Sequence, residues 1–476
     1  MVPDTLPLDF IELMHRSLPD EQMYESFLAF SDKPLRRSIR VNTLKISTAE
    51  FIHRMQPQGW HFTAIPWCPD GFWLERDDDC TALGNTLEHL GGLFYIQEAS
   101  SMLPVTALFH YLSSRAPYLI LDAAAAPGSK TTQIATHLDH LGAIVANEFS
   151  ASRIKGLFSN LQRCGIGNVA LTNYNADVFG KWLPETFDGI LLDAPCSGEG
   201  TMRKDPKAMD NWSLSHVQDI ASLQASLIES VFQALKPGGI LIYSTCTLNH
   251  LENQDVVASL QELYPDAVEL LPLGALFEEA NKAETAEGFL HVWPQLYDCE
   301  GFFIAALKKT KSVPTPTVAK KVKALPFTPA TTKQQQLLKS YLKGQFSLTI
   351  DNSSILMVRE HEYWLFPEPL LALTGEIRFD RIGLKVAEQF KKEFRLTHEA
   401  ASHFMPQITK NKVELSLVQA QQYFQGKDIP YPDAQQGAGE VILTCGQILL
   451  GLGKQLKGKI KNRLPRDLVR DNIAFK

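Results

Sequence analysis

The sequence predicts an α/β fold built on an open parallel sheet, with smaller modules on both sides of it. Between about residues 118 and 308, apolar β-rich runs alternate with longer amphipathic stretches, which is typical of βαβ units. The run "LKPGGILIY" (235–243) indicates a helix that stops at a proline and two glycines before a fully buried strand. The 476 residues exceed what one hydrophobic core usually covers, so two to four domains are expected.

Apolar runs within this block are predicted to form the strands of the sheet. They cover residues 118–124, 143–148, 168–173, 187–195, 238–247 and 301–309. A Ser or Asn stands where each of four amphipathic stretches starts, and both residue types are good N-caps. Helices are therefore expected to begin near Ser129, Ser150, Ser213 and Asn249.

A smaller α+β segment precedes the core, and a mixed region follows it. Residues 311–333 are rich in Pro, Thr and Lys, which is typical of a linker. Beyond the linker, residues 352–367 look like a hairpin and residues 440–454 like paired strands. The expected division is an N-terminal module (1–94), the core (95–310), the linker (311–333), a small module (334–388) and a C-terminal module (389–476).

Composition excludes several classes of protein. The first twenty residues are acidic and interrupted by prolines, without a basic n-region or an apolar h-region, so no signal peptide is expected. The longest apolar runs are far short of the roughly 20 residues that span a bilayer, which favours a cytoplasmic protein without membrane contact. Seven scattered cysteines include no CxxC pair, so neither disulfides nor a metal site is expected.

The charge pattern leaves room for a polyanionic partner. A formal net charge of −7 argues against indiscriminate binding to polyanions, although a local basic face can still bind them. Residues 33–45 hold five bases and no acid, and residues 454–470 hold seven bases against one acid. Taken alone, either stretch fits a solvated charged face as well as a phosphate-binding one.

The segment after the first strand indicates a cofactor site, because ligands of open parallel sheets bind at the carboxyl ends of the strands. In "LDAAAAPGSKT" (121–131), small residues and Gly128 allow a ligand to approach the backbone, but neither G-x-G-x-x-G nor a P-loop motif is present. This favours an adenosine cofactor with less phosphate. Glu148 ends the second strand, where an acid binds ribose hydroxyls, although a single glutamate there is more often a surface carboxylate.

Two cysteines stand at the same predicted edge of the sheet. Cys196 follows the fourth strand in "DAPC", and Cys246 ends the fifth in "STCT". Each cysteine alone is more often a small buried hydrophobe than a nucleophile. If the two strands are neighbours, they lie about 4.8 Å apart, and both sulfurs address one substrate. Lys130 approaches the same space from the first strand, and a nearby cation favours a thiolate.

An adenosine cofactor, an acid and two thiols together predict methyl transfer to C5 of a cytosine. C5 is too poor a nucleophile to take a methyl group directly from S-adenosylmethionine. A thiolate that adds at C6 gives C5 enamine character, and loss of the C5 proton and of the thiol then restores the ring. Asp193 would hydrogen-bond the exocyclic amine or a ring nitrogen of the base, which must first leave its stack. This chemistry alone leaves open which cysteine attacks.

Motifs in the same order resemble those of the Nol1/Nop2/Sun family of RNA cytosine-C5 methyltransferases, with high specificity over about residues 30–310. They are "RVNTLK" (40–45), "YIQEASSMLP" (95–104), "DAAAAPGSKT" (122–131), "DAPCSGEGTMRKDP" (193–206), "STCT" (244–247) and "GFF" (301–303). The resemblance implies a Rossmann-like class I S-adenosylmethionine-dependent methyltransferase core with a small N-terminal RNA-binding module. The stretches 290–307 and 450–471 resemble one bacterial subgroup, which implies a pre-PUA module and a PUA-like RNA-binding module at the C-terminus.

The resemblance also assigns roles to residues. The family's nucleophile is the cysteine of the Thr-Cys motif, here Cys246, and Cys196 is implied to assist release of the methylated RNA. DNA cytosine methyltransferases use a Pro-Cys thiol instead, so the choice rests on the whole set of motifs. Where the family usually has an aspartate after the third strand, this chain has Asn175. Asn175 is kept as a cofactor residue because an amide also pairs with an adenine edge, and Asp177 is the alternative. The implied cofactor residues are Ala124, Ala125, Ala126, Pro127, Gly128, Ser129, Lys130, Glu148, Asn175 and Asp193.

The implied cofactor is S-adenosyl-L-methionine, and the implied partner is 16S rRNA within the 30S subunit, methylated in its decoding region by a monomeric enzyme. The stretches 33–45 and 454–470 then become expected phosphate contacts. Trp212 either stacks on a flipped base or belongs to the core. Two other interpretations stay open: a tRNA cytosine-C5 methyltransferase, and a non-catalytic RNA-binding factor of ribosome assembly, against which the intact site residues argue.

Overall fold

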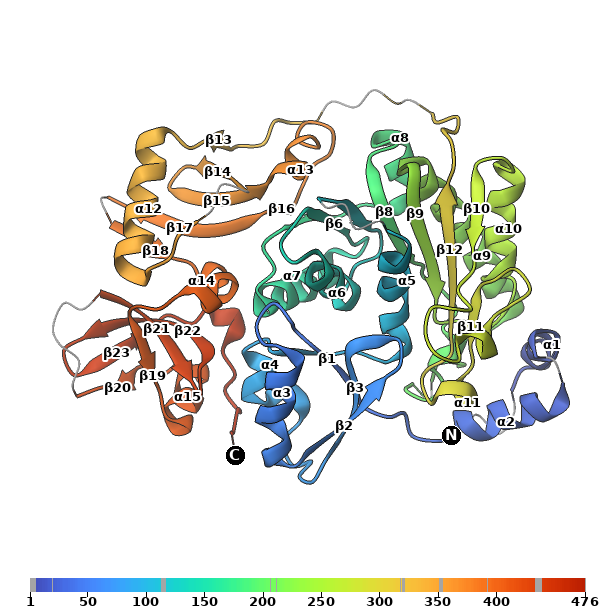
Figure 1. Cartoon of the computed structure of the whole chain (residues 1–476), viewed down its shortest axis with the longest axis horizontal. Helices are drawn as coiled ribbons and strands as arrows, with labels where there is room; N and C mark the ends of the chain where they lie inside the picture. The colour runs from blue at the N-terminus through green and yellow to red at the C-terminus, as the bar shows by residue number, and fades with distance from the viewer. Residues whose placement is uncertain are drawn as a thin grey trace.

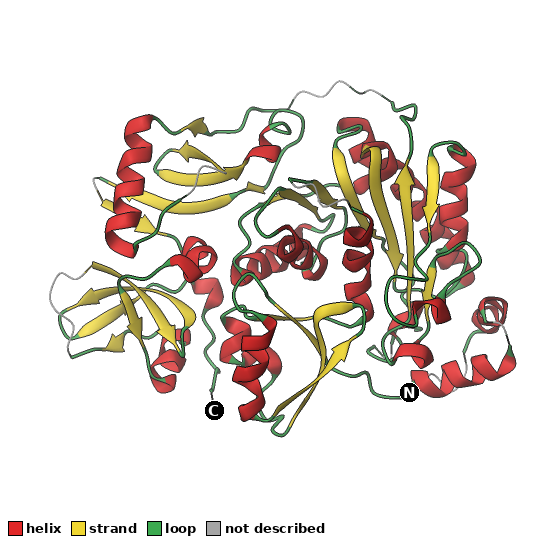
Figure 2. Ribbon diagram, in the orientation of Figure 1, coloured by secondary structure: helices red, strands yellow, loops and turns green. Residues whose placement is uncertain are grey.

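A central sheet covered by helices on both faces dominates the molecule, and three smaller sheets lie beside it (Figures 1 and 2). The computed structural model describes residues 6–18, 20–112, 117–205, 207–210, 212–316, 318, 322–350, 354–391, 393–432 and 439–475. Within this part of the chain, no helix has both the length and the apolar character needed to cross a membrane.

The central sheet has the order β10-β12-β9-β8-β5-β6-β7-β16, and β11 pairs with β12. Its strands are β5 (Leu119–Asp122), β6 (Ala143–Asn147), β7 (Val169–Thr172), β8 (Phe187–Asp193), β9 (Leu235–Thr245), β10 (Val268–Leu271), β11 (Leu290–Val292), β12 (Phe302–Lys309) and β16 (Arg381–Ile382). Strands β5 to β9 are parallel, and β12 is antiparallel to β9. The predicted strands are confirmed. The order in which strands are added to the sheet reverses between β5 and β8, and folds of this kind bind ligands at that point.

Helices on the two faces of this sheet create two apolar cores. They are α5 (Leu103–Tyr111), α6 (Ser129–Leu138), α7 (Ala151–Cys164), α8 (Phe179–Trp182), α9 (Leu214–Ala234), α10 (Gln254–Leu263) and α11 (Pro294–Tyr297). Side chains of α5, α6 and α7 pack on one face, and those of α8, α9 and α10 pack on the other. Burial on both faces explains why the strands read as continuous apolar runs.

Three of the predicted helix starts agree with the structure to within one residue, and one is wrong. Ser213 caps α9 by accepting a hydrogen bond from His216 N–H at 3.3 Å, and Ser150 directly precedes α7. Ser129 is the first residue of α6, whose N-cap is Gly128 at φ 104°. The helix expected near Asn249 begins at Gln254 instead. Asn249 Oδ1 accepts the Glu252 N–H at 2.9 Å, as an N-cap would, while its backbone N–H and side-chain amide donate to the buried carboxylates of Glu199 and Glu252.

The N-terminal segment forms two separate structures. Its elements are α1 (Leu8–Ser17), α2 (Glu21–Ser31), β1 (Ser38–Val41), α3 (Thr48–Met55), β2 (Trp60–Ile65), β3 (Cys68–Arg76), α4 (Leu87–Leu90) and β4 (Phe94–Ile96). The strands form a sheet of order β2-β3-β1-β4. Helices α1 and α2 lie apart from that sheet, beside the central sheet, as Figure 1 shows. Their apolar side chains pack on Met202, Trp212, Leu248 and Trp293 of the core.

Two further sheets form the C-terminal part. The elements are β13 (Thr328–Pro329), α12 (Thr332–Phe346), β14 (Ser354–Arg359), β15 (Glu362–Pro367), α13 (Glu368–Leu371), β17 (Leu384–Phe390), β18 (Glu393–Leu396), α14 (His398–Phe404), β19 (Lys412–Glu414), α15 (Leu417–Phe424), β20 (Ile429–Pro430), β21 (Gly439–Cys445), β22 (Ile448–Leu456) and β23 (Lys459–Asn462). Strands β14 and β15 form the expected hairpin, and β21 pairs with β22. The expected module boundary after residue 388 falls inside β17, so this division of the chain stays a prediction.

The basic stretch 33–45 is only partly a surface. Arg40 is 2% exposed and donates hydrogen bonds to Gln97 Oε1 at 2.9 Å and Thr132 Oγ1 at 2.8 Å. Lys45 Nζ donates to Gly91 O at 2.9 Å, Arg163 O at 2.7 Å and Ser402 Oγ at 2.9 Å. The expectation of phosphate contacts is therefore wrong for these two bases, because each joins parts of the fold that are distant in sequence.

We expect Lys45→Met to lower the free energy of unfolding by about 3 kcal/mol, because it leaves three acceptors without the amine that donates to them. Urea unfolding followed by tryptophan fluorescence measures this. The matched control is Lys155→Met, which removes an exposed lysine of α7. Equal stability of the two variants would contradict the structural role of Lys45.

Candidate active site

The loop after β5 is fixed by residues at the ends of the neighbouring strands. Asn147 Nδ2, at the end of β6, donates to Ala123 O at 3.0 Å and to Tyr174 O at 2.9 Å. Glu148 Oε2 accepts the Ala126 N–H at 3.2 Å, and its carboxylate is almost fully buried. The ends of β5, β6 and β7 are therefore held in one cluster. Sequence reasoning predicted Glu148 here and missed Asn147, which ends the apolar run of β6.

The same loop carries only small side chains along its backbone. Residues 123–126 are alanines, and a Cβ added to Gly128 would lie 3.0 Å from Leu157 Cδ1. Asp122 is fully buried and accepts a hydrogen bond from Thr131 Oγ1 at 2.6 Å, while its Oδ1 makes no hydrogen bond within the part of the chain that is described. Burial raises the pKa of Asp122 to about 6. A small, polar-ended cradle of this kind suits an adenosine cofactor.

Asn175 and Asp177 both follow β7. Asn175 Oδ1 accepts the Asp177 N–H at 3.4 Å and so caps a short 3-10 turn. Both side chains are half-buried, which leaves the choice between them open.

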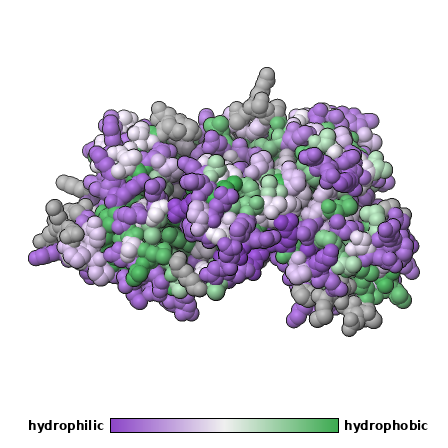
Figure 3. All heavy atoms as spheres, turned by 60° about the horizontal axis from the view of Figure 1, so that its bottom comes forward, coloured by the Kyte–Doolittle hydropathy of each residue, from purple (hydrophilic) through white to green (hydrophobic). Residues whose placement is uncertain are grey.

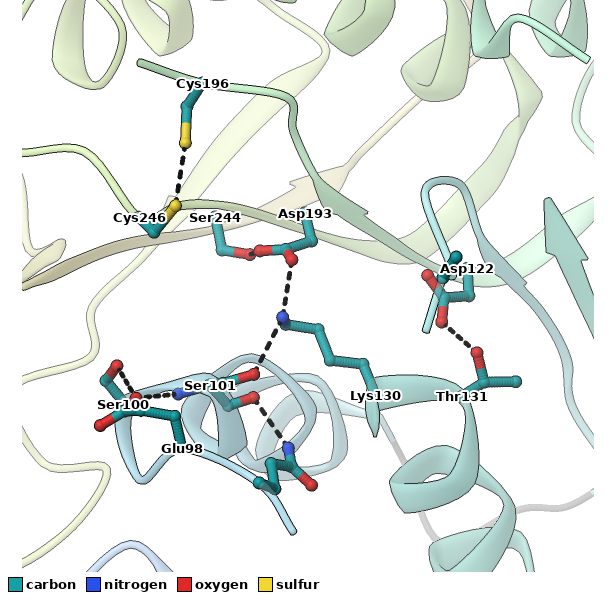
Figure 4. A network of polar contacts seen from close by, with 12 residues as sticks. Glu98, Ser100, Ser101, Asp122, Lys130, Thr131, Asp193, Cys196, Ser244 and Cys246 are labelled. Atoms are coloured by element: carbon teal, nitrogen blue, oxygen red, sulfur yellow. Dashed lines mark hydrogen bonds and ion pairs between the residues drawn. The ribbon is translucent and has the colours of Figure 1, made fainter. Parts of the chain in front are cut away.

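The two cysteines meet at the sheet edge, as Figure 4 shows. Strands β8 and β9 are parallel neighbours with Asp193 opposite Ser244, which confirms the expected adjacency. Cys196 Sγ and Cys246 Sγ are 3.2 Å apart, and both residues are half-buried. The hydrogen bond to Cys246, together with burial, raises the pKa of Cys196 well above its ordinary value. Either sulfur can donate the S–H of this contact, and the raised pKa favours the thiol form of Cys196.

Lys130 reaches this space from α6, and its closest partner is a carboxylate. Its Nζ donates to Asp193 Oδ2 at 2.6 Å and to Ser101 Oγ at 3.1 Å (Figure 4). Ser244 Oγ donates to Asp193 Oδ1 at 2.8 Å. Burial alone would lower the pKa of Lys130, but the Asp193 carboxylate outweighs it and the pKa is raised. The sequence predicted that Lys130 stabilises a thiolate, whereas the structure pairs it directly with Asp193.

Glu98 holds Ser101, a hydrogen-bond partner of Lys130. Sequence reasoning missed Glu98, although it stands in "YIQEASSMLP". Its Oε2 accepts the Ser101 N–H at 3.2 Å, and its Oε1 accepts the Glu300 N–H at 3.0 Å. Glu300 is 5% exposed, with Lys204 Nζ 3.6 Å from its Oε1. Burial and the neighbouring Glu98 raise the pKa of Glu300 to about 7.

This raised pKa predicts a pH-dependent stability. The ordinary pKa of 4.5 applies to the unfolded chain, so the protonated Glu300 carboxyl stabilises the fold below that pH, and its contribution is lost as the pH rises through 7. Glu300→Gln removes this dependence. We therefore expect the variant to be more stable than wild type at pH 8 by up to about 3 kcal/mol, and equal to it at pH 4.5. Urea unfolding at both values measures this, with the exposed Glu278→Gln as control. A pH-independent difference would contradict the assignment.

Trp212 belongs to the core rather than to a base-binding surface. It is 9% exposed, its ring meets Phe10 edge-on with centroids 5.6 Å apart, and its Nε1–H donates to Glu199 Oε1 at 2.7 Å. Stacking on a flipped base, one of its two expected roles, is therefore wrong. In the described part of the chain, no group of three His, Cys, Asp or Glu side chains is arranged to hold a metal ion.

The sheet topology thus brings a cradle for an adenosine cofactor and a pair of thiols to one edge, beside the reversal point. This combination defines a class I S-adenosylmethionine-dependent methyltransferase. Ribosomal RNA small subunit methyltransferase F of Psychromonas ingrahamii is 54% identical over 474 residues, which cover 99% of this chain and 98% of the relative. The chain therefore belongs to the ribosomal RNA small subunit methyltransferase F family.

Other comparisons agree along the whole chain. The proteins of that name from Vibrio cholerae and Escherichia coli are 51% and 52% identical, over 99% and 98% of this chain and 99% and 98% of their own lengths. Family models match residues 6–99 (N-terminal domain of 16S rRNA methyltransferase RsmF), 110–308 (16S rRNA methyltransferase RsmB/F), 327–403 (ribosomal RNA small subunit methyltransferase F, pre-PUA domain) and 410–470 (methyltransferase RsmF PUA domain).

Solved structures share the core fold. A methyltransferase homologue from Pyrococcus horikoshii is 33% identical with a TM-score of 0.51, over 64% of this chain and all of that one. NSun6 from the same organism, determined with SFG, is 23% identical with a TM-score of 0.52, over 63% of this chain and 97% of its own. The chain is an S-adenosylmethionine-dependent methyltransferase with an N-terminal domain and a C-terminal PUA domain.

Proposed function

We propose that this enzyme methylates C5 of a cytosine in the decoding region of 16S rRNA, and that it acts as a cytoplasmic monomer on the 30S subunit. The RNA substrate is supported by full-length identity to relatives named for the small-subunit ribosomal RNA. The reaction is supported above all by the two sulfurs, 3.2 Å apart beside Asp193, because C5 of cytosine needs covalent activation.

Cys246 is the nucleophile in this proposal. Its sulfur adds to C6 as a thiolate, which forms the S–C6 bond and moves the electron pair of the C5–C6 double bond to C5. When bound, S-adenosylmethionine supplies the electrophilic methyl group that C5 receives. A general base then removes the C5 proton, the C5–C6 double bond forms again, and the Cys246 thiolate leaves C6. Cys196 stabilises this leaving thiolate, since its raised pKa keeps the S–H available at 3.2 Å.

Asp193 and Lys130 act on the ring of the base. The Asp193 carboxylate accepts a hydrogen bond from the exocyclic amine, which orients the cytosine over the thiols. The Lys130 ammonium, held 2.6 Å from that carboxylate, stabilises the negative charge that the ring acquires when the thiolate adds. Both side chains are fixed in advance by Ser244 and Ser101, so little reorganisation accompanies the step.

A groove beside the site supplies the proposed path of the RNA. It has a volume of about 850 Å³ and lies between the N-terminal sheet and the loop after the first thiol. Its basic lining residues are Arg36, Arg37, Arg76, Arg203 and Lys204, of which Arg76 and Arg203 are buried and paired with Asp79 and Asp298. The side chains of Arg37 and Lys204 are 57% and 65% exposed, and Glu98 links the groove to Ser101 and Lys130. Figure 3, which turns the bottom of Figure 1 forward, shows hydrophilic atoms across the middle of the molecule.

The PUA domain adds a second basic surface. Within residues 454–470, Arg463 pairs with Glu440 and Lys459 with Asp428, so these two bases are partly neutralised. The remaining bases are exposed: Lys454, Lys457, Lys461, Arg466 and Arg470. We expect them to contact phosphates and to make RNA binding salt-dependent.

The test is methylation with a labelled methyl donor, with 30S subunits, naked 16S rRNA and tRNA in parallel, followed by bisulfite mapping of the product. We expect 5-methylcytosine in the decoding region with 30S subunits as the best substrate. Label in tRNA alone would show that tRNA is the substrate, in place of 16S rRNA. Binding to 30S subunits without any label would show that the protein is a non-catalytic assembly factor.

Glu148 offers a separate test of the cofactor site. We expect Glu148→Gln to weaken binding of S-adenosylhomocysteine by about 10- to 100-fold, because an amide has one acceptor oxygen where the carboxylate has two, and places an NH2 group against N–H and O–H donors. Isothermal titration calorimetry measures the change. The exposed Glu287→Gln is the control. The same titration with Asn175→Ala and Asp177→Ala identifies which side chain contacts the cofactor, and an unchanged affinity of the Glu148 variant would remove it from the site.

A further inference from the structure

Two carboxylates are buried behind the paired thiols, and the mechanism above does not use them. Glu199 comes three residues after Cys196, and Glu252 comes six residues after Cys246. Both side chains are completely buried. A buried carboxylate is costly unless it is well hydrogen-bonded, so its partners indicate what it holds in place.

Glu199 hydrogen-bonds the loop that carries the other thiol. The donors to its oxygens are Thr247 Oγ1 (2.8 Å), Leu248 N–H (3.0 Å), Asn249 N–H (3.0 Å), Asn249 Nδ2 (2.9 Å) and Trp212 Nε1 (2.7 Å). Three consecutive residues directly after Cys246 are therefore fixed by one carboxylate.

Glu252 does the reverse and hydrogen-bonds the loop of the first thiol. Its Oε2 accepts the Ser197 N–H at 3.0 Å and Gln224 Nε2 at 3.0 Å. The same amide of Gln224 donates to Pro195 O at 2.8 Å, so the residues on both sides of Cys196 are held.

Further contacts join the two halves into one network. Asn249 Nδ2 donates to Glu252 Oε1 at 2.8 Å as well as to Glu199, and the Ser197 and Thr247 hydroxyls are 2.8 Å apart. Each carboxylate thus belongs to the segment of one thiol and binds the segment of the other. The separation of the two sulfurs is set by this crossed arrangement rather than by the strands alone.

We propose that Glu199 and Glu252 are positioning residues with different tasks: Glu199 sets Cys246 for attack on the base, and Glu252 sets Cys196 for release of the product. This inference rests on the proposed function of the two thiols. Replacement by glutamine keeps the shape, but an amide has one acceptor oxygen and places an NH2 group against N–H donors. Each variant therefore displaces the loop that its carboxylate holds.

The experiment compares Glu199→Gln and Glu252→Gln with Glu262→Gln, an exposed glutamate of α10, as control. For each protein, kcat and KM for 30S subunits are measured, and covalent protein–RNA adducts are counted on denaturing gels. Affinity for S-adenosylhomocysteine and the unfolding temperature report on the rest of the fold. RNA containing 5-fluorocytidine provides a trap, because the fluorine at C5 cannot leave as a proton.

We expect Glu199→Gln to lower kcat at least 30-fold with KM within twofold, and to form the adduct on the fluorinated RNA more slowly by the same factor. We expect Glu252→Gln to lower kcat by a similar factor and to accumulate an adduct on ordinary RNA. If Glu199→Gln does not fold, Thr247→Val removes one hydroxyl of the same network and should slow adduct formation in a milder form.

The failures are distinguishable. If wild-type enzyme makes no 5-methylcytosine, the proposed function fails. If wild-type enzyme methylates RNA and both variants behave like Glu262→Gln, or if both lose activity with the same adduct level, the positioning roles are wrong.

Discussion

Cys246→Ala is expected to abolish methyl transfer and covalent capture of RNA together. Without the sulfur, nothing adds to C6, and C5 stays too weak a nucleophile for transfer. The loss should exceed about 10⁴-fold in single-turnover rate, since covalent activation is removed entirely. A labelled methyl donor measures the rate, and denaturing gels measure capture. Binding of S-adenosylhomocysteine should stay within twofold of wild type, because the cofactor loop is built from other strands.

Cys196→Ala should give the opposite result to Cys246→Ala in the amount of covalent adduct seen on denaturing gels. Addition and methyl transfer stay possible, but the Cys246 thiolate then leaves without the second thiol, whose sulfur lies 3.2 Å from it in the wild-type protein. A denaturation-resistant protein–RNA adduct should therefore accumulate while turnover falls. An adduct with Cys246→Ala and none with Cys196→Ala would reverse the roles of the two thiols.

Lys130→Met is the second variant with a large expected effect. It leaves the Asp193 carboxylate without its cation and removes the charge that stabilises the ring during addition. We expect kcat to fall about 10³-fold, which corresponds to about 4 kcal/mol of transition-state stabilisation. Single-turnover methylation of 30S subunits measures this.

Two controls sharpen the Lys130 result. Lys181→Met removes an exposed lysine of α8 and should leave the rate unchanged. Asp193→Asn keeps the shape but places an amide against the Lys130 and Ser244 donors, and it should lower kcat to a similar extent. Loss of RNA affinity without loss of kcat in Lys130→Met would make the lysine a phosphate contact instead.

The sequence predicted the central sheet well because its strands are buried on both faces and so read as apolar runs. It also predicted that Cys196 and Cys246 meet, since consecutive parallel strands of such folds are often neighbours and both end at one edge. The helix start at Asn249 was wrong for a physical reason. An asparagine that caps a helix and one that bridges two buried carboxylates look identical until the partner segment, around Glu199, is placed.

The sequence also did not predict contacts between segments that are far apart in the chain. Arg40 and Lys45 stand in a run of bases that looks like a surface, but their partners lie far along the chain, at Thr132, Arg163 and Ser402. The pairing of Lys130 with Asp193 was close to the expectation of a cation at the thiols, yet the partner depends on side-chain geometry that spacing does not contain.

The packing of α1 and α2 has a consequence for how the protein is made. Synthesis delivers these helices before the core, but the apolar side chains that cover them are those of Met202, Trp212, Leu248 and Trp293, which come later in the chain. Phe10 and Phe27, both fully buried in the finished fold, therefore stay uncovered until most of the core has left the ribosome. The segments after both thiols are therefore covered by helices that were synthesised before them, so a protein that lacks α1 and α2 would carry both cysteines without this packing.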